Sequence, residues 1–284
     1  MRLHTSYRIG GPADIYAEPL DENELKEVVS AAINVGVAYF ILGGGSNILV
    51  SDKGIRGMVI SLEHVRHLEI NDKTCRVGAG MAMSDIVEYT CIHGLKGLES
   101  FYAMPGDVGG AVWMNARCYG VSISEMIAEI RVLDPGSGFK IFIPKEEDFD
   151  YKKSPFQKNG QIILEVLFNL EKADKDDLIR RMAEVRQDRI QKGHYLSPSA
   201  GSVFKNNRSF GKPSGMIIDS LGLRGYRIGE AVVSPQHANF IINTGDASAR
   251  DVKALIDHIM ERVKEAYGYQ LEPEVLLVGE WEET

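Results

Sequence analysis

The sequence has little cysteine. Its three cysteines, Cys75, Cys91 and Cys118, are odd in number and lack Cys-x-x-Cys spacing, which argues against a disulfide framework and against a zinc site. We expect buried, reduced thiols of the kind found in cytoplasmic proteins. The seven histidines include no His-Glu-x-x-His motif and no cluster with the spacing of metal ligands. No metal is therefore expected.

Long apolar runs and excess positive charge are also missing. No segment approaches the roughly 20 apolar residues of a transmembrane helix, and the first eight residues contain no apolar core of a signal peptide. The net charge of -8 argues against non-specific binding to nucleic acid or to an anionic membrane. We expect a cytoplasmic protein, with one large domain or two domains in its 284 residues.

Three common nucleotide-binding and hydrolase motifs do not occur. There is no G-x-x-x-x-G-K-[ST], the motif of P-loop nucleotidases. Read from Gly43, the dinucleotide fingerprint requires a glycine at Ile48 and a following helix, whereas Ile48-Leu49-Val50 is typical of a strand. Ser202 lies in Ala-Gly-Ser-Val-Phe and not in G-x-S-x-G, so a hydrolase elbow has no support.

A run of three glycines, Gly43 to Gly45, followed by Ser46 and Asn47, lies between two apolar stretches. Consecutive glycines allow positive φ and remove every Cβ from the surface. Successive N–H groups can then converge on an anion such as phosphate. The run predicts a phosphate-bearing ligand, although glycine clusters are also common in plain turns.

A mixed pattern of helices and strands surrounds this run. Apolar residues at helical spacing predict helices over 21–34, 83–93, 174–192, 215–221 and 247–267. Short alternating or apolar runs predict strands over 37–42, 48–50, 58–61, 75–79, 127–132, 140–143, 162–169, 230–234, 238–243 and 272–279. No regular strand–helix–strand rhythm is present, which favours an α+β fold. The charged helix over 174–192 suggests a domain boundary near residue 172.

The faces of these helices follow from the same spacing. Asp21 is the expected N-cap of the first helix, whose apolar face is formed by Leu25, Val28, Val29, Ala32 and Ile33. Leu178, Ile179, Met182 and Val185 form that of the charged helix.

A second glycine-rich segment runs from Met104 to Ala111 and continues through Asn115 to Gly120. Taken singly, the remaining polar residues have ordinary explanations. Ser202 lies in a Pro/Gly loop where serine is usually a turn former, and Glu274 and Lys152 could be surface charges. His237 could be a structural hydrogen-bonding group. Taken residue by residue, the sequence therefore predicts an α+β protein that binds a phosphate-bearing compound.

The ordered set of motifs resembles the UDP-N-acetylenolpyruvoylglucosamine reductase family, in its compact class. The flavin half is recognised by Thr5-Ser6-Tyr7-Arg8-Ile9-Gly10-Gly11-Pro12-Ala13-Asp14, Leu42-Gly43-Gly44-Gly45-Ser46-Asn47 and Pro105-Gly106-Asp107-Val108-Gly109-Gly110-Ala111, with Asn115 and Tyr119-Gly120. The substrate half is recognised by Pro198 to Asn206, Ser234 to Phe240 and Leu271 to Val275. The resemblance spans nearly the whole chain.

The resemblance implies a flavin fold of the vanillyl-alcohol-oxidase type that holds FAD non-covalently. It implies an FAD-binding domain over 1–172, in subdomains of about 1–57 and 58–172. A substrate-binding domain follows over 173–284, and its last strand, about 271–279, returns toward the active site. The implied cofactor-binding residues are Leu42, Gly43, Gly44, Gly45, Ser46, Asn47, Ile48, Leu49, Pro105, Gly106, Gly109, Gly110 and Asn115.

The resemblance also implies a two-stage reaction that makes UDP-N-acetylmuramate for bacterial peptidoglycan. NADPH reduces FAD, and the enolpyruvoyl ether of the UDP-sugar then takes hydride from the flavin and a proton from Ser202. Glu274 and Lys152 match the other catalytic positions, and Lys205, Asn206 and Tyr151 match substrate-binding positions. No nucleic acid, membrane or obligate protein partner is implied.

Two departures from the family pattern leave alternatives open. Tyr151-Lys152-Lys153-Ser154 has lysine where the family has an arginine that faces the substrate carboxylate, and lysine lacks the bidentate fork. Either Lys152 suffices or another cation such as Arg189 replaces it. Arg117-Cys118 stands where the family has Gly-Ala. The alternatives are a catalytically impaired UDP-sugar and FAD-binding relative, or a flavin oxidase with another substrate.

Overall fold

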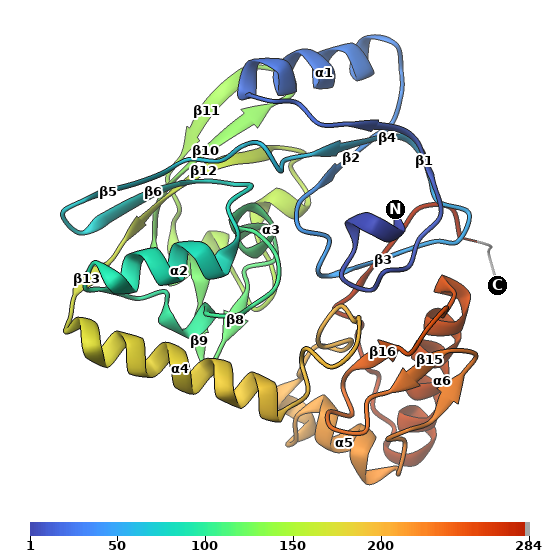
Figure 1. The fold of residues 1–284 in the computed structure, drawn as a ribbon. Coiled ribbons are helices and arrows are strands. Elements are labelled where there is room, and N and C mark those ends of the chain that lie inside the picture. Colours follow the sequence, from blue (N-terminus) through green and yellow to red (C-terminus); the bar gives the residue numbers. More distant parts are fainter. Residues whose placement is uncertain (282–284) are drawn as a thin grey trace. The chain divides into compact units, whose positions relative to one another are not determined.

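The computed structural model describes residues 1–281, and the chain divides into two units (Figure 1). Unit 1 contains Met1–Asp14, Gly45–Arg56 and the chain from Arg189 onward, and unit 2 contains Ile15–Gly44 and Gly57–Asp188. The glycine run is therefore shared, because the chain passes from unit 2 to unit 1 between Gly44 and Gly45. The domain limits expected from the sequence, at residues 172 and 173, stay a prediction.

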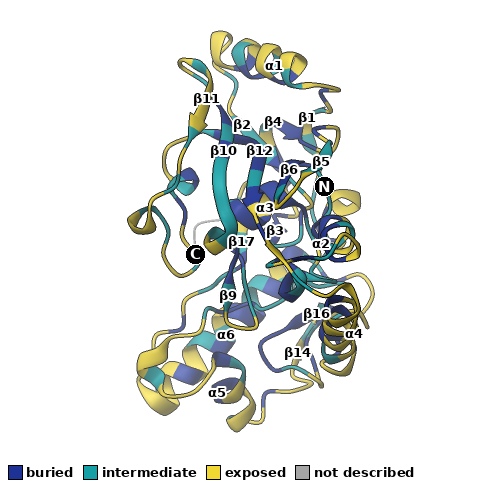
Figure 2. Ribbon diagram, turned by 90° about the vertical axis from the view of Figure 1, so that its left-hand side faces the viewer, coloured by how far each residue is buried: buried dark blue, intermediate teal, exposed yellow. Residues whose placement is uncertain are grey.

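A five-stranded antiparallel sheet is the centre of unit 2, in the order β11-β10-β12-β6-β5. Its strands are β5 (Leu68–Asn71), β6 (Thr74–Gly78), β10 (Ile127–Asp134), β11 (Gly138–Phe142) and β12 (Ile162–Asn169). The central strand β12 is buried along most of its length, whereas the edge strand β11 is largely exposed (Figure 2). The burial of β12 accords with its sequence, since every residue of 162–168 except Glu165 is apolar.

Three helices and most of a smaller sheet complete the core of unit 2. The helices are α1 (Glu22–Asn34), α2 (Met83–Ile92) and α3 (Val108–Trp113), and the sheet has the order β1-β4-β2, from β1 (Ala13–Ala17), β2 (Tyr39–Leu42) and β4 (Ile55–Ser61). The helix α3 packs on β12 and β6. Asp21 caps α1 by accepting hydrogen bonds from the backbone N–H groups of Asn23 and Glu24, at 2.8 and 2.9 Å.

Shorter elements occur in both units. They are β7 (Leu95–Lys96) paired with β13 (Glu171–Lys172), β8 (Arg117–Cys118) paired with β9 (Val121–Ser122), and the 3₁₀ turns η1 (Arg2–His4), η2 (Glu99–Phe101), η3 (Ile123–Met126), η4 (Glu146–Asp148), η5 (Pro155–Gln157) and η6 (Arg208–Phe210). Helix α4 (Lys175–Gln191) begins in unit 2 and ends in unit 1.

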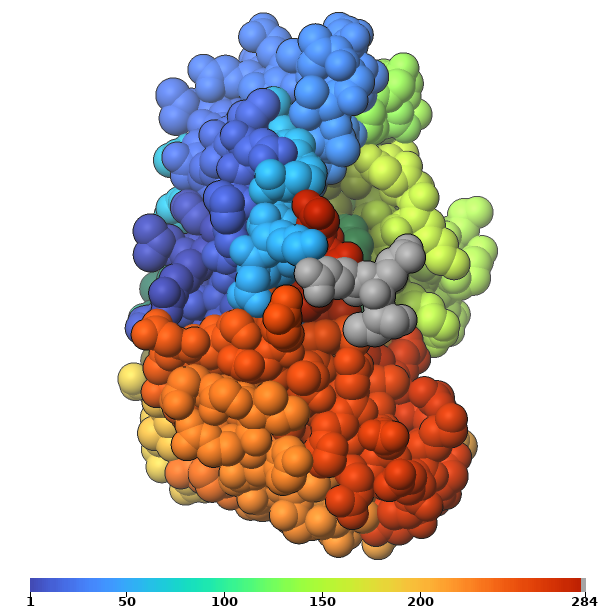
Figure 3. Space-filling model, turned by 90° about the vertical axis from the view of Figure 1, so that its right-hand side faces the viewer, coloured from blue at the N-terminus to red at the C-terminus, as the bar shows by residue number. Residues whose placement is uncertain are grey.

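Unit 1 has its own sheet and core. Strands β14 (Arg227–Ile228), β15 (Ala231–Val233) and β16 (Ile241–Asn243) form an antiparallel sheet on which α6 (Ala249–Tyr267) packs. Helix α5 (Ser214–Ser220) packs on α6. A parallel pair joins β3 (Ile48–Val50) to β17 (Leu276–Val278). Figure 3 shows the red end of the chain, which follows β17, beside the blue segment of unit 1 that follows β3. The last strand thus lies directly beside the strand that follows the glycine run.

The helices expected from the sequence are all present, with small differences at their ends. Five apolar residues at helical spacing along α6 are buried: Val252, Leu255, Ile256, Ile259 and Val263. Two apolar assignments were wrong, because Ile33 in α1 and Ile179 in α4 are exposed, at 47% and 39%. Cys75 and Cys91 are buried as expected, but Cys118 is only half-buried.

Candidate active site

The first two glycines of the run allow two segments of unit 2 to approach closely. A Cβ at Gly43 would lie 2.5 Å from Oδ2 of Asp107, and a Cβ at Gly44 would lie 2.8 Å from Cα of Gly106. Both distances are shorter than real Cβ contacts, so no larger residue fits without movement. The two glycine-rich segments expected to bind the cofactor are therefore packed against each other.

At Gly45, the third position of the run, glycine is required for a different reason. Gly45 has a φ of 58°, and a Cβ there would lie 2.1 Å from the carbonyl oxygen of His4. Within the run, only Gly45 takes the left-handed conformation on which the sequence argument relied. Its carbonyl oxygen accepts a hydrogen bond from the N–H of Ser6 at 3.1 Å, and the hydroxyl of Ser6 donates to the carbonyl oxygen of Ser199 at 2.7 Å. Ser6 thus connects Gly45 to the loop that carries Ser202.

Asp107 is the residue that sequence reasoning missed in the second segment. It is the N-cap of α3, a helix that was not predicted. Its carboxylate accepts a hydrogen bond from the N–H of Gly110 at 2.8 Å and another from the N–H of Gly44. Burial raises the pKa of Asp107 to about 6. The Pro-Gly-Asp sequence before an apolar residue is the signal that could have identified this cap.

The outer face of these segments is almost free of side chains. Gly44, Pro105 and Gly110 are exposed, whereas Asp107 beneath them is only 8% exposed. Two of these three exposed residues are glycines without a Cβ, which lets a phosphate oxygen come close to the main chain there. The residues present therefore fit a diphosphate group such as that of FAD.

Lys152, one of the expected catalytic residues, lies in a tight turn of unit 2. Asp150 and Lys153 exchange backbone hydrogen bonds of 3.2 and 3.0 Å across it, and Lys152 has a φ of 58°. Non-glycine residues adopt this conformation infrequently. Asn115, itself at a φ of 41°, donates from its side-chain amide to the carbonyl oxygen of Asp150 at 2.8 Å.

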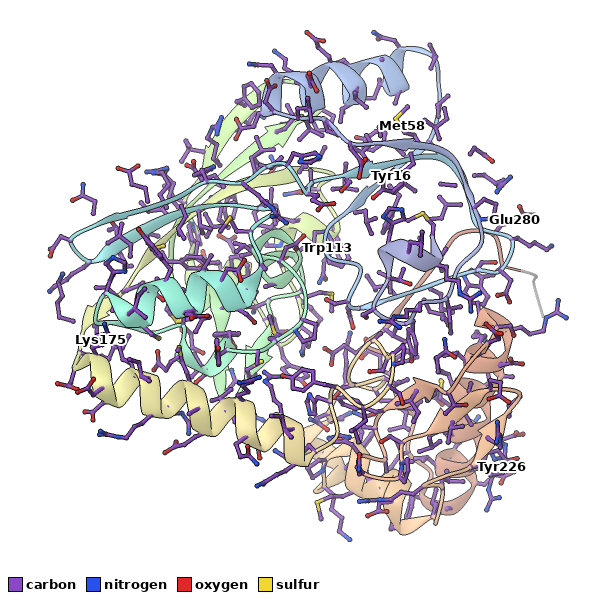
Figure 4. All side chains as sticks on the ribbon, in the orientation of Figure 1. Tyr16, Met58, Trp113, Lys175, Tyr226 and Glu280 are labelled. Carbon is purple, nitrogen blue, oxygen red and sulfur yellow. The ribbon has the colours of Figure 1, made fainter. Side chains whose placement is uncertain are left out.

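The end of α3 also holds the residues after this turn. The carbonyl oxygen of Trp113, which is labelled in Figure 4, accepts hydrogen bonds from Ser154 at 2.7 Å and from the side chain of Gln157 at 3.0 Å. The same side chain donates to the carbonyl oxygen of Lys152 at 3.1 Å. One short helix therefore supports the Gly44 contact at its first residues and the Lys152 turn at its last.

Ser202 and Glu274 come from neighbouring segments of unit 1. The N–H of Glu274 donates to the carbonyl oxygen of Val203 at 2.7 Å, directly after Ser202. The side-chain amide of Asn47 donates to the carbonyl oxygen of Glu274 at 3.1 Å. Both Ser202 and Glu274 are half-buried, and within residues 1–281 no hydrogen bond to the Ser202 hydroxyl is observed. A half-buried hydroxyl of this kind is available to a ligand.

Asn239 holds this serine segment in place. Its side chain accepts from the N–H of Phe204 at 3.0 Å and donates to the carbonyl oxygen of the same residue at 2.9 Å. Asn239 is 4% exposed. Its sequence motif was recognised, but its role as a backbone clamp beside Ser202 was not, because the pairing spans 35 residues.

The predicted substrate-binding residues have partners within unit 1 or lie on the surface. Lys205 forms an ion pair with Glu272, and the side-chain oxygen of Asn206 accepts from the N–H of Ser214 at 2.9 Å, at the start of α5. Tyr151, in the unit 2 turn, is 38% exposed. Their role toward a substrate stays a prediction.

Two further candidates differ in kind. The Nδ1 atom of His237 accepts from the N–H of Asn239 at 3.3 Å, and burial lowers the pKa of His237. These observations favour a structural role for His237, as a group that accepts a backbone hydrogen bond. Arg189, the alternative cation, is only 6% exposed.

Along residues 1–281, no helix is long and apolar enough to span a membrane, and no group of three or more histidine, cysteine, aspartate or glutamate residues could hold a metal ion.

Comparison with known protein families locates two matches along the chain. Residues 13–139 match the model described as an FAD binding domain. Residues 191–278 match that of the C-terminal domain of UDP-N-acetylenolpyruvoylglucosamine reductase. The α+β fold class with an FAD-binding domain is thereby confirmed.

Curated relatives that align with nearly the whole chain are also named UDP-N-acetylenolpyruvoylglucosamine reductase. The UDP-N-acetylenolpyruvoylglucosamine reductase of Treponema denticola is 45% identical, over 98% of this chain and 91% of its own. That of Halalkalibacterium halodurans is 40% identical, over 98% and 92%.

A solved structure agrees. The crystal structure of the reductase from Thermus caldophilus superposes with a TM-score of 0.81 at 35% identity, over 98% of this chain and 96% of that one. The chain is thus an FAD-dependent oxidoreductase that belongs to the UDP-N-acetylenolpyruvoylglucosamine reductase family.

Proposed function

We propose that this enzyme reduces the enolpyruvoyl ether of UDP-N-acetylglucosamine enolpyruvate to UDP-N-acetylmuramate, with NADPH as the reductant. The proposal is carried by the 45% identity to a relative of that name over 98% of the chain. We place the reaction in the bacterial cytoplasm, as a step in the synthesis of the peptidoglycan precursor.

The two glycine segments are the proposed cradle of the FAD diphosphate. Gly44, Pro105 and Gly110 offer an exposed main-chain surface. Bound FAD would supply the hydride that reduces the substrate double bond. The remaining requirements, a proton at the adjacent carbon and a partner for the substrate carboxylate, fall to side chains.

Ser202 is the proposed proton donor. A hydroxyl is a weak acid, but a positioned one can protonate a carbanion-like carbon, and such transfers contribute about 10²–10⁴-fold. The Asn239 clamp at Phe204 holds the backbone two residues away, which supports a fixed hydroxyl position.

Glu274 and Lys152 are proposed to act on the developing charge of the substrate carboxylate. Glu274 must be protonated or donate through a hydrogen bond, since a bare carboxylate would repel that charge. Lys152 supplies a positive charge without the bidentate fork of arginine. We propose that Lys205, Asn206 and Tyr151 contact the UDP-sugar.

A second candidate function rests on Lys152. Its lysine side chain, which lacks the bidentate fork of arginine, favours a relative that binds FAD and the UDP-sugar but is catalytically impaired.

One experiment separates the two functions. The flavin absorbance is followed anaerobically while NADPH and then the enolpyruvoyl substrate are added to the holoenzyme. Bleaching by NADPH and full return with substrate, at a rate that matches steady-state turnover, are expected for the reductase. Bleaching with no return, or with only very slow return, contradicts the proposed reaction and supports the catalytically impaired relative.

A further inference from the structure

Within unit 2, the Asp107 carboxyl joins Gly43 and Gly44 of the glycine run to the second glycine segment. It accepts hydrogen bonds from the N–H of Gly110 at 2.8 Å and from the N–H of Gly44. Its Oδ2 atom also lies where a Cβ at Gly43 would have to be. The carboxyl therefore occupies backbone donors of the surface that we assign to the FAD diphosphate.

Few charges surround this carboxyl. The glycine run over 43–46 and the helix over 108–113 contain no ionisable side chain, and neither does the segment 81–83, which pairs with Asp107 through Ala82. Arg66, from the loop after β4, attracts the carboxylate but contributes less than the backbone hydrogen bonds. Arg66 is exposed, and it lies 4.0 Å from Glu63. A second anion at this surface would thus meet little compensating positive charge.

We propose that Asp107 couples flavin binding to the uptake of one proton, because its carboxyl is held as the neutral acid when the diphosphate lies on the glycine segments. This inference rests on the proposed placement of the diphosphate. A neutral carboxyl still accepts from a backbone N–H through its carbonyl oxygen, so protonation keeps one of the two contacts with Gly44 and Gly110 and weakens the other. An ionised carboxyl beneath the diphosphate would repel it in a site of low dielectric constant.

The expected pH dependence follows from the raised pKa. In the free protein the pKa of Asp107 is about 6, and a nearby diphosphate raises it further, since like charges disfavour ionisation. Affinity for FAD is then highest below pH 6 and falls as the pH rises through that value. The diphosphate of FAD stays fully ionised from pH 5.5 to 8.5, so the ligand itself contributes no slope.

The test measures FAD binding to apoprotein, prepared by flavin removal, between pH 5.5 and 8.5. For the wild type we expect the Kd to rise at least about tenfold between pH 6 and pH 8. Calorimetry at pH 7 in two buffers of different ionisation enthalpy should show uptake of close to one proton per FAD. Asp107→Asn keeps an acceptor but cannot titrate, so its Kd should be nearly independent of pH. The control Asp85→Asn removes an exposed carboxylate of α2 and should retain the wild-type slope.

The possible results separate the two levels of the proposal. A wild-type Kd that is flat with pH, without proton uptake, overturns the coupling and needs no variant to fold. If Asp107→Asn raises the Kd by the same factor at every pH, the pH dependence does not come from Asp107 and the coupling is also overturned. Asp107 is then a structural cap at the diphosphate site. A Kd unaffected by Asp107→Asn and by Asp107→Ser at all pH values places the diphosphate elsewhere, so the proposed cradle fails as well.

Discussion

At Lys152 the backbone conformation favours glycine, whereas the residue present has a long charged side chain. The turn between Asp150 and Lys153 requires a φ of 58° at this position, which a glycine adopts without cost and a lysine does not. A long charged side chain at such a position supports the hypothesis that Lys152 has a function, since a smaller residue would suit the turn better.

We therefore predict that Lys152→Gly lowers kcat/KM for the enolpyruvoyl substrate about 10- to 150-fold, the range expected when a hydrogen bond to a charged group is lost. The melting temperature should not fall, because glycine fits the turn. Lys152→Arg restores the fork and should match or exceed the wild-type rate. Steady-state kinetics measure both, and unchanged kcat/KM in Lys152→Gly would assign the role to another cation.

At Ser202 the prediction concerns one half-reaction. Ser202→Ala should leave reduction of the flavin by NADPH unchanged and slow its reoxidation by substrate about 10²–10⁴-fold. Rapid-mixing absorbance measurements resolve the two steps. Ser197→Ala, which removes a hydroxyl from the same loop, is the control and should reoxidise normally; a normal rate in Ser202→Ala as well would exclude Ser202 as the proton donor.

Among the elements, α3 carries most of the local organisation of unit 2. Only six residues long, it has Asp107 at its beginning and Trp113 and Asn115 at its end, in contact with the Lys152 turn. The sequence around it is rich in glycine, which has low helix propensity. Tertiary packing and the Asp107 cap stabilise this helix, and for that reason it was not predicted. The amphipathic helices α1 and α6 were, because their apolar spacing is local information.

Asn115 tests whether this helix end acts through the turn or through the cofactor. Asn115→Gly removes the hydrogen bond to Asp150, and a longer one of 3.4 Å from the N–H of Ser124, without straining a φ of 41°. We expect slower flavin reoxidation by substrate, by about tenfold, the effect of one net hydrogen bond, with the Kd for FAD within about twofold. A large rise in that Kd with normal reoxidation would instead support the cofactor-binding role that the family resemblance implies.

For the whole molecule, the three thiols report on folding. Cys75 and Cys91 are fully buried, and burial raises the pKa of each thiol to about 12. Cys118 is half-buried. Thiolates react with disulfide reagents, so buried neutral thiols react only after unfolding.

Titration with a chromogenic disulfide at pH 8 should therefore detect one reactive thiol in the native protein and three in denaturant. Cys118→Ser should reduce the native count to zero. Rapid reaction of two or three thiols in the native wild type would show that the core of unit 2 opens readily.

The order of motifs along the chain and the periodicity of its apolar residues determined the family, the α+β class and most helices. Those signals are local, because a helix face or a glycine run is formed by residues of one short segment. The tertiary structure alone decided what the glycines contact. Gly43 and Gly44 are small because Asp107 and Gly106 approach them from about 60 positions away, and the same approach buries the Asp107 carboxyl and raises its pKa. Burial and close approach depend on segments distant in the chain, and no spacing rule encodes them.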